Sequence, residues 1–199
     1  MPADLADPKC VEALKANLES VATSIDTVIL NAGTCEYLDV EHYETALVER
    51  VLQVNVLGLS RCIEASLPLV RNSNNHPHIV GISSAAAITG LPRAEAYGAS
   101  KAAVVSFLES LGLDLNRYGI DVSVVYPGFV ETPLTDLNDF PMPFIMDVGT
   151  ATELIIDGIE KRRHKVAFPK RLIWSLKLMA ALPESLRFKL GLGMVRNPA

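Results

Sequence analysis

The chain has 199 residues, 49% of them hydrophobic, which is enough to bury one core in a single domain. It has no apolar run of about 18 residues, which argues against a membrane-spanning helix, and its charged N-terminal segment argues against a signal peptide. Cys10, Cys35 and Cys62 show neither disulfide-like nor metal-like spacing, so we expect a reduced, cytoplasmic protein without a metal site.

The formal net charge of −5 is unevenly distributed along the chain. Residues 161–199 contain ten Lys or Arg and one acidic residue, Glu184, which leaves eight basic and 22 acidic groups in the first 160 residues. A basic terminal segment indicates either a solvated helix face or contact with an acidic surface. With an acidic main part, we expect no nucleic-acid partner.

Taken in chain order, hydrophobic periodicity predicts helices that alternate with short buried strands. Asp7 and Pro8 are typical of a helix start, and residues 27–30 form a β-branched run expected to be buried on both faces of a sheet. The expected elements are a helix over 8–23, a strand over 27–30, a helix over 42–52 that continues through Asn55 to about 70, a strand over 78–82, a helix over 97–118, a strand over 121–126, a helix over 150–163 and a strand over 165–168. This alternation predicts an α/β fold, a parallel sheet with helices on both faces.

The last part of the chain departs from this alternation. From residue 170 an apolar stripe with basic neighbours runs to a break at Pro183, and a second apolar group continues to Met194. We expect a helix packed on its own core or on a partner subunit, with an interfacial membrane helix as the alternative. We therefore divide the chain into a domain of residues 1–169 and a C-terminal amphipathic, basic extension of residues 170–199.

The stretch from Ile82 to Lys101 carries residue types suited to proton transfer. If a helix starts here, Tyr97 and Lys101 lie one turn apart on the same face. A phenol with a pKa of about 10 exchanges protons poorly at neutral pH, and a nearby ammonium lowers that pKa. Ser84, directly after a predicted strand, is placed to hydrogen-bond the same substrate oxygen. Alone, a Tyr-x-x-x-Lys pair is more often a solvated helix face.

Three further segments give this pair a context. They are Asn31-Ala-Gly33 after the first strand, Asn55-Val-Leu-Gly58 inside a helical pattern, and Tyr126-Pro-Gly-Phe-Val-Glu-Thr132 after the third strand. In this order and spacing the motifs resemble the classical short-chain dehydrogenase/reductase family, to about residue 170. The resemblance implies a Rossmann-like, doubly wound parallel sheet and an enzyme that interconverts an alcohol and a carbonyl with NAD or NADP.

The resemblance also implies a role for each matching residue. Tyr97 is the expected catalytic acid/base, Lys101 lowers its pKa and holds the nicotinamide ribose, and Ser84 positions the substrate oxygen. Asn55 is expected to kink its helix and anchor a water of the proton relay, and Ser83 to support the neighbouring loop. Besides Tyr97 and Lys101, the implied cofactor-binding residues are Asp4, which touches the adenine ring, Leu5, Asn31, Ala32, Gly33, Pro127, Gly128, Val130 and Thr132.

One part of the family pattern is missing from the sequence. The glycine-rich turn Thr-Gly-x-x-x-Gly-x-Gly, which binds the pyrophosphate, has no match before Asn31, and Gly33 is the first glycine. Residues 1–5 resemble the end of the third family strand, so we expect an N-terminally truncated chain in which strand 27–30 is a sheet edge. Two interpretations remain open: an active enzyme in its complete form, or an inactive truncated fragment or non-catalytic binding protein that keeps the half-fold.

The expected partners follow from the apolar segments. Residues 88–95 and the Pro-rich loop 129–146, which matches the family's lid, are largely apolar, so we expect an apolar alcohol or carbonyl substrate. The apolar face of helix 97–118 is too wide for one sheet contact, and in the family this helix builds a dimer interface. We therefore expect a homo-oligomer, with peripheral membrane contact through the C-terminal extension as a further candidate.

Overall fold

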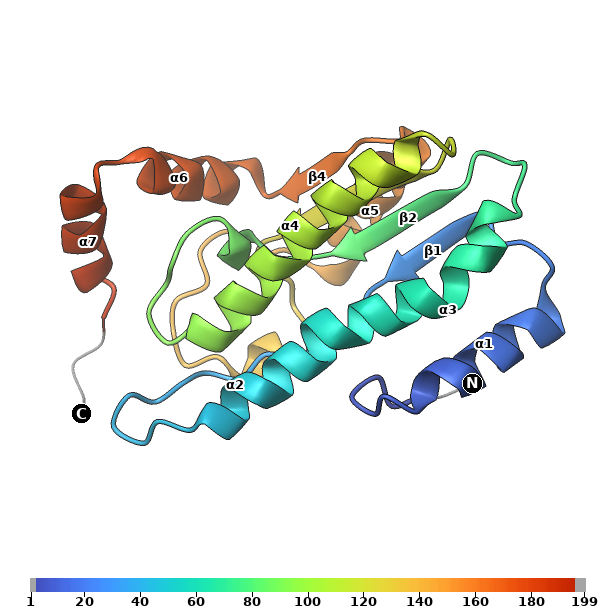
Figure 1. The fold of residues 1–199 in the computed structure, drawn as a ribbon. Helices are drawn as coiled ribbons and strands as arrows, with labels where there is room; N and C mark the ends of the chain where they lie inside the picture. The colour runs from blue at the N-terminus through green and yellow to red at the C-terminus, as the bar shows by residue number, and fades with distance from the viewer. Residues whose placement is uncertain (1–2, 196–199) are drawn as a thin grey trace.

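The computed structural model describes residues 3–195 (Figure 1). Its strands are β1 (Thr27–Leu30), β2 (His78–Ile82), β3 (Asp121–Pro127) and β4 (Lys165–Phe168). Its helices are α1 (Cys10–Val21), α2 (Thr45–Leu52), α3 (Leu59–Arg71), α4 (Glu95–Asn116), α5 (Val148–Glu160), α6 (Lys170–Ala181) and α7 (Glu184–Leu192). A π-helical segment, η1 (Gln53–Gly58), joins α2 to α3, and η2 (Ala85–Ala87) and η3 (Thr135–Leu137) are 3-10 turns.

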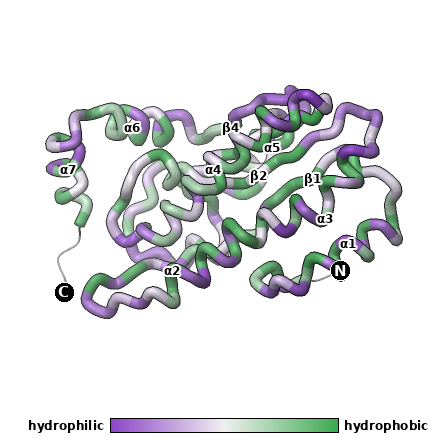
Figure 2. Tube along the Cα trace, in the orientation of Figure 1, coloured by the Kyte–Doolittle hydropathy of each residue, from purple (hydrophilic) through white to green (hydrophobic). Residues whose placement is uncertain are grey.

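The four strands form one parallel sheet in the order β1-β2-β3-β4. Helices α3 and α4 lie on one face of the sheet and α5 lies on the other (Figure 1). The strands are hydrophobic along most of their length (Figure 2), as expected when both faces of a parallel sheet are covered. The predicted α/β fold with a parallel sheet is confirmed.

Strand β1 is an edge of this sheet within the described residues, because it pairs with β2 alone. The register places Leu30 beside Gly81, on the α3/α4 face, and Ile29 beside Val80, on the α5 face. Leu30 is 7% exposed, whereas Ile29 is 54% exposed. The expected sheet edge is confirmed. The expectation that both faces are buried is wrong for Ile29, because α5 packs on β3 and β4 and leaves β1 uncovered.

The N-terminal residues form turns where the sequence predicted regular structure. Asp4 Oδ1 accepts a hydrogen bond from Ala6 N at 2.9 Å, and Asp7 Oδ1 accepts one from Lys9 N at 2.9 Å. Helix α1 therefore begins at Cys10, two residues later than predicted. The predicted strand end is wrong for residues 3–5, and residues 1 and 2 lie outside the described part.

The long helix expected around Asn55 runs from α2 through η1 to α3. It begins at Thr45 instead of residue 42, because Asp39 closes a turn: its carboxylate accepts from Glu41 N at 3.0 Å and its carbonyl from His42 N at 3.2 Å. Asn55 lies in the π-helical segment, where the regular hydrogen-bond ladder is interrupted. Such π segments occur frequently at functional sites.

Helices α6 and α7 lie beyond one end of the sheet (Figure 1). Leu172, Ile173 and Leu176 of α6 are buried and belong to the same core cluster as the apolar residues of α3 and α4. The break predicted at Pro183 is confirmed, since α6 ends at Ala181 and α7 starts at Glu184. Among the described residues, every helix lacks the combined length and apolarity that a membrane crossing needs.

Candidate active site

Several residues singled out in the sequence follow the carboxyl ends of neighbouring strands. Asn31 comes directly after β1, Ser83 and Ser84 after β2, and Gly128 after β3. The carboxyl ends of parallel strands meet at one edge of the sheet, which is where open α/β sheets bind ligands. A cleft of about 280 Å³ opens at this edge.

Most of the predicted site residues line this cleft. They are Asn31, Gly33, Ser84, Tyr97, Lys101, Pro127, Gly128, Val130 and Thr132. The opposite wall is largely apolar and comes from α5 and β4, with Val148, Ala151, Ile155 and Phe168. No local pattern marks this wall in the sequence, since these residues only form part of a helix face and a strand end.

Tyr97, Lys101 and Ser84 meet at the floor of the cleft. Lys101 is one turn after Tyr97 on α4 and is 5% exposed, and its Nζ lies 5.8 Å from the centroid of the Tyr97 ring. The ammonium donates a hydrogen bond to the Ile82 carbonyl at 3.1 Å. Ser84 accepts from Ala86 N at 3.1 Å and makes a side-chain hydrogen bond with Tyr97. Ser84 and Tyr97 are therefore joined by their side chains, and the Lys101 ammonium lies on the ring side of Tyr97.

Burial sets the pKa of both ionisable groups in this cluster. Loss of hydration raises the pKa of Tyr97, and the hydrogen bond with Ser84 opposes this rise. Burial also lowers the pKa of Lys101 to about 8, while the nearby Cys35 opposes that change. The direction at Tyr97 is opposite to the lowering expected from Lys101, because the loss of hydration dominates.

Asn55 lies behind the cleft and ties two of its walls together. Its side chain is 1% exposed. Its Oδ1 accepts from Thr34 N at 2.8 Å, and its Nδ2 donates to Thr34 O and to Ser100 Oγ, both at 2.9 Å. Ser100 Oγ in turn donates to the Tyr97 carbonyl at 2.7 Å. Asn55 therefore joins the loop after β1 to the first turn of α4.

Two small residues hold α4 against the strand ends. At Gly33 a Cβ atom would lie 3.1 Å from Lys101 Nζ and 3.2 Å from Asn55 Oδ1, so the loop after β1 approaches the ammonium closely only because it has no side chain there. Ser83 Oγ donates to the Lys101 carbonyl at 2.9 Å. Ser83, expected to support its loop, supports the helix that carries Lys101.

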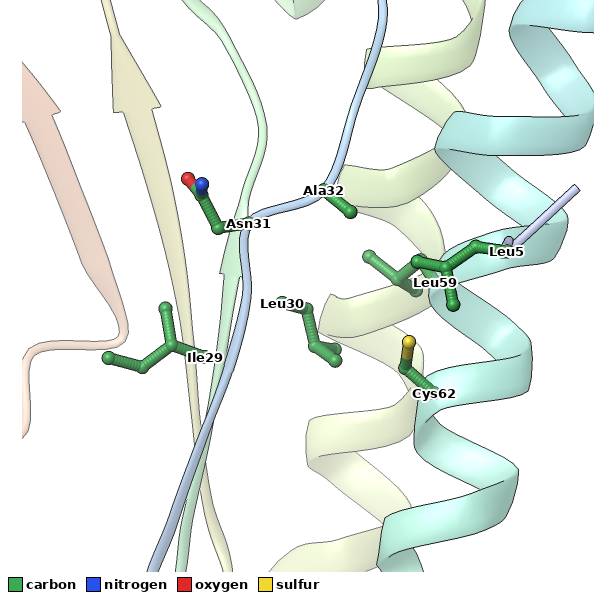
Figure 3. A pocket seen from close by; sticks show the side chains of 7 residues that line it. All are labelled: Leu5, Ile29, Leu30, Asn31, Ala32, Leu59 and Cys62. Carbon is green, nitrogen blue, oxygen red and sulfur yellow. The ribbon is translucent and has the colours of Figure 1, made fainter. Parts of the chain in front are cut away.

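The remaining predicted residues lie outside this cleft. Ala32 and Leu5 line a neighbouring cavity of about 90 Å³ between β1 and α3, which shares Asn31 with the cleft (Figure 3). Figure 3 shows Leu30 pointing toward α3, while Ile29 and Asn31 point to the other side of β1. Asp4 lines neither space, and its carboxylate is used in the turn to Ala6.

An aromatic cluster anchors the loop formed by residues 129–146. Tyr37 Oη donates to Asn138 Oδ1 at 2.7 Å, although 101 residues separate them. The Tyr37 ring packs edge-on against Phe140, with centroids 5.5 Å apart, and Phe140 packs in turn against Phe129. Arg93 lies 5.5 Å above the Tyr37 ring. The sequence analysis missed Tyr37, and likewise Thr34 and Ser100, although Thr34 follows Gly33 directly and Ser100 precedes Lys101.

Comparison with known proteins agrees with this arrangement. A family model described as short chain dehydrogenase matches residues 1–139. An uncharacterized oxidoreductase of Myxococcus xanthus is 36% identical over 176 residues, which make up 88% of this chain and 69% of that protein. Several curated relatives are longer proteins, of which the chain spans 54–69%.

Solved structures share the fold at lower identity. A short chain dehydrogenase from Burkholderia cenocepacia, in complex with NADP, has a TM-score of 0.80 and 22% identity, and the match covers 94% of this chain and 76% of that one. A short chain dehydrogenase/reductase from Burkholderia phymatum, in complex with NAD, has a TM-score of 0.79 and 22% identity, with 100% and 77% covered. The expected Rossmann-like architecture is confirmed.

Proposed function

Because this chain belongs to the short-chain dehydrogenase family, we propose that it interconverts an alcohol and a carbonyl compound with NAD or NADP. The observation that carries the proposal is the meeting of Ser84, Tyr97 and Lys101 on the floor of one cleft at the carboxyl edge of the sheet. A phenol bonded to a hydroxyl, with an ammonium nearby, is a set that can transfer a proton to or from an oxygen atom.

In this mechanism Tyr97 exchanges the proton with the substrate oxygen. In the reducing direction its hydroxyl donates a proton as the carbonyl oxygen becomes an alcohol, and the Ser84 hydroxyl donates a hydrogen bond to the same oxygen. Burial raises the pKa of Tyr97, which disfavours the phenolate. The positive charge of Lys101 stabilises the phenolate that forms when the proton leaves.

The cleft fits the nicotinamide end of such a cofactor, which when bound supplies or accepts the hydride. Gly33 leaves Lys101 Nζ accessible from the loop after β1, since no Cβ stands 3.1 Å from it. Asn31, Lys101 and Thr132 offer polar groups for the ribose and amide, and Pro127, Gly128 and Val130 offer a surface for the ring. Gly33 is the first glycine of the 199 residues, so we assign no residue to the pyrophosphate, and leave Asp4 and Leu5 as candidates for the adenine end.

We further propose an apolar substrate and a homo-oligomer in the cytoplasm. The α5 and β4 wall of the cleft favours an apolar group next to the reacting carbon. Helix α4 exposes Phe107 and Leu113, the latter at 81%, and a second subunit would cover them. Three free cysteines accord with a reducing compartment.

Replacing Tyr97 with Phe tests the proposal. Turnover of apolar ketones and secondary alcohols with NAD(H) or NADP(H) should fall about 10²–10⁴-fold, because general acid–base catalysis is lost while the ring is kept. Cofactor affinity, measured by calorimetry, should stay within about twofold, since the phenol acts on the proton step. Tyr118→Phe, at an exposed tyrosine beyond the end of α4, is the matched control.

Near-normal turnover in the Tyr97→Phe variant would contradict the assignment. The second candidate function, a non-catalytic binding protein, rests on the missing glycine-rich turn. It predicts a ligand bound in the cleft without turnover by the parent chain. An inactive fragment predicts neither binding nor turnover.

A further inference from the structure

Helix α6 has two apolar faces. Leu172, Ile173 and Leu176 point into the core and are at most 8% exposed. Trp174 and Leu178 are 69% and 68% exposed. A helix that only covers a core has one apolar stripe, so the second stripe calls for a separate contact.

The exposed stripe carries positive charge along its length. Residues 170, 174, 177, 178 and 181 share one side of a helix of 3.6 residues per turn, and all five are exposed. Lys170 and Lys177 therefore lie beside Trp174 and Leu178, and Lys177 Nζ is 5.5 Å from the centroid of the Trp174 ring. Arg171 lies on the other border of the stripe.

Helix α7 continues this surface. It buries no residue, and its large apolar side chains, Leu186, Phe188, Leu190 and Leu192, are 44–66% exposed. Arg187 donates to the Ala180 carbonyl at 3.2 Å, which fastens α7 to the end of α6. We call the exposed residues of α6 and α7 the outer surface. It lies at the end of the molecule away from α1 (Figure 1), and hydrophobic and hydrophilic residues alternate along it (Figure 2).

The basic residues of the outer surface have no ion-pair partner in the described part of the chain. Helices α6 and α7 contain five basic residues, Lys170, Arg171, Lys177, Arg187 and Lys189, and one acidic residue, Glu184. Within residues 3–195, the ion pairs do not include any of these five. The surface is therefore both apolar and cationic.

We propose that the outer surface docks on an anionic lipid bilayer. Helices that lie in a membrane interface combine Trp, Phe and Leu on the buried side with Lys and Arg near the phosphates. The indole of Trp174 suits the headgroup depth, where aromatic rings with a polar edge gather. The lysines beside it reach anionic headgroups while their alkyl chains stay over the apolar stripe.

The same charge argues against a second copy of the chain as the partner that covers the outer surface. A two-fold symmetric contact would bring the same surface of both copies together, and so the basic residues of one copy against those of the other. Like charges at a contact repel, whereas an anionic bilayer attracts all of them at once. A head-to-tail contact with the acidic part of another copy avoids this repulsion. The experiment below distinguishes such a contact from membrane docking.

Docking here would bring the cleft close to the lipid. Helix α6 packs against η2, which follows Ser84 directly. At Gly128, which lines the cleft, a Cβ would lie 2.7 Å from Leu172 Cδ2 on the buried side of α6. An apolar substrate dissolved in the bilayer would therefore reach the cleft over a short path. The docking itself does not depend on the proposed function.

Flotation of the purified full chain with vesicles tests the proposal. One set of vesicles contains phosphatidylcholine alone, and the other contains about one third phosphatidylserine, which supplies the negative surface potential that attracts basic residues. The protein should float with the second set and stay at the bottom with the first. About 0.5 M salt should release much of it, because salt screens the charge attraction.

Two double variants separate the apolar from the charged part of the surface. Lys170→Gln/Lys177→Gln should weaken partitioning about 30-fold, since each basic residue near such a membrane contributes about fivefold. Trp174→Ser/Leu178→Ser should weaken it at least as much. Matched controls at exposed positions elsewhere, Val21→Ser and Lys9→Gln/Arg117→Gln, should float like the parent chain.

Trp174 gives an independent readout because it is the only tryptophan. Its emission should shift to the blue on addition of anionic vesicles and be quenched by brominated lipid. Unchanged emission together with absent flotation would overturn the proposal. So would emission that is already blue-shifted without lipid, in a species whose size grows with protein concentration, because a second copy would then cover Trp174.

Discussion

Lys101 is an ammonium group with almost no contact with water. It is 5% exposed, bonds the Ile82 carbonyl and lies below the Tyr97 ring. Burial brings its pKa from 10.5 to about 8, so the folded chain holds this proton less tightly than the unfolded chain does. The buried charge of Lys101 therefore lowers the stability of the fold.

This cost predicts how a Lys101→Met variant depends on pH. Since the pKa is lower in the folded chain, the charged lysine destabilises the fold at pH 7 by about 3 kcal/mol, and the penalty disappears as the pH rises from about 8 to 10.5. Methionine keeps the packing and removes the charge. The free energy of unfolding of the variant minus that of the parent, measured by urea denaturation, should fall by about 3 kcal/mol between pH 7 and pH 10.5.

Lys9→Met, at an exposed lysine before α1, is the control for the loss of one positive charge. A Lys101→Met difference that changes with pH no more than the Lys9→Met difference would mean that the ammonium is hydrated in solution. In the Lys101→Met variant the Ile82 carbonyl loses the hydrogen bond from the ammonium. This loss lowers the free energy of unfolding by about 1–3 kcal/mol at every pH and does not change how the difference depends on pH.

At the scale of elements, the close approach of α5 to β4 depends on Gly158. A Cβ at this position would lie 2.3 Å from Val166 Cγ2 and 2.9 Å from Val166 Cγ1. Valine is β-branched and has few rotamers, so it has little freedom to move aside. Gly158→Ala should therefore destabilise the protein by about 1–2 kcal/mol, after the gain of about 1 kcal/mol from better helix propensity.

Gly191→Ala in α7 is the matched control, because a Cβ there has no neighbour within 4 Å. It should raise the free energy of unfolding by as much as about 1 kcal/mol. The change in the free energy of unfolding is measured for both variants by thermal unfolding followed by circular dichroism. Equal effects of the two substitutions would show that α5 packs less closely on β4 than the structure has it.

Local sequence predicted the strands well and the helix starts less well. β1, β2 and β4 have the expected bounds because each is a short apolar run between turn residues. α1 and α2 begin late because Asp7 and Asp39 bond neighbouring backbone groups and compete with the helix. The exposure of Ile29 could not be predicted, because it depends on how far α5 extends across the sheet.

In the candidate site, too, features set by local sequence were predicted and features set by long-range packing were not. Tyr97, Lys101 and Ser84 were found because their spacing or their place after a strand is local information. The contact from Tyr37 to Asn138 joins residues 101 positions apart, and no local pattern marks it. The rise in the pKa of Tyr97 was missed for a similar reason, since burial depends on elements that pack over α4.

At the scale of the whole molecule, β1 is one edge of the sheet and exposes an apolar side chain. Its side chain Ile29 is 54% exposed, and its outer backbone groups face away from β2. Unpaired apolar edges join other chains, and charged side chains on an edge prevent this. Ile29→Lys should therefore lower the oligomeric fraction of the purified chain severalfold, as seen by light scattering.

Val21→Lys, at a position 80% exposed in α1, is the control for the added charge. It should leave the size distribution as it is in the parent chain. If both substitutions reduce association equally, net charge and not the strand edge governs it.

The cleft draws on the carboxyl ends of all four strands, from Asn31 after β1 to Phe168 at the end of β4. This order has a consequence for the chain as it leaves the ribosome. At about 5–20 residues per second, the interval between the first and the last of these segments lasts on the order of ten seconds. Throughout the second half of that time the nascent chain already contains Asn55, Ser84, Tyr97 and Lys101. The residues of α5 and β4 that complete the cleft have not yet all been synthesised.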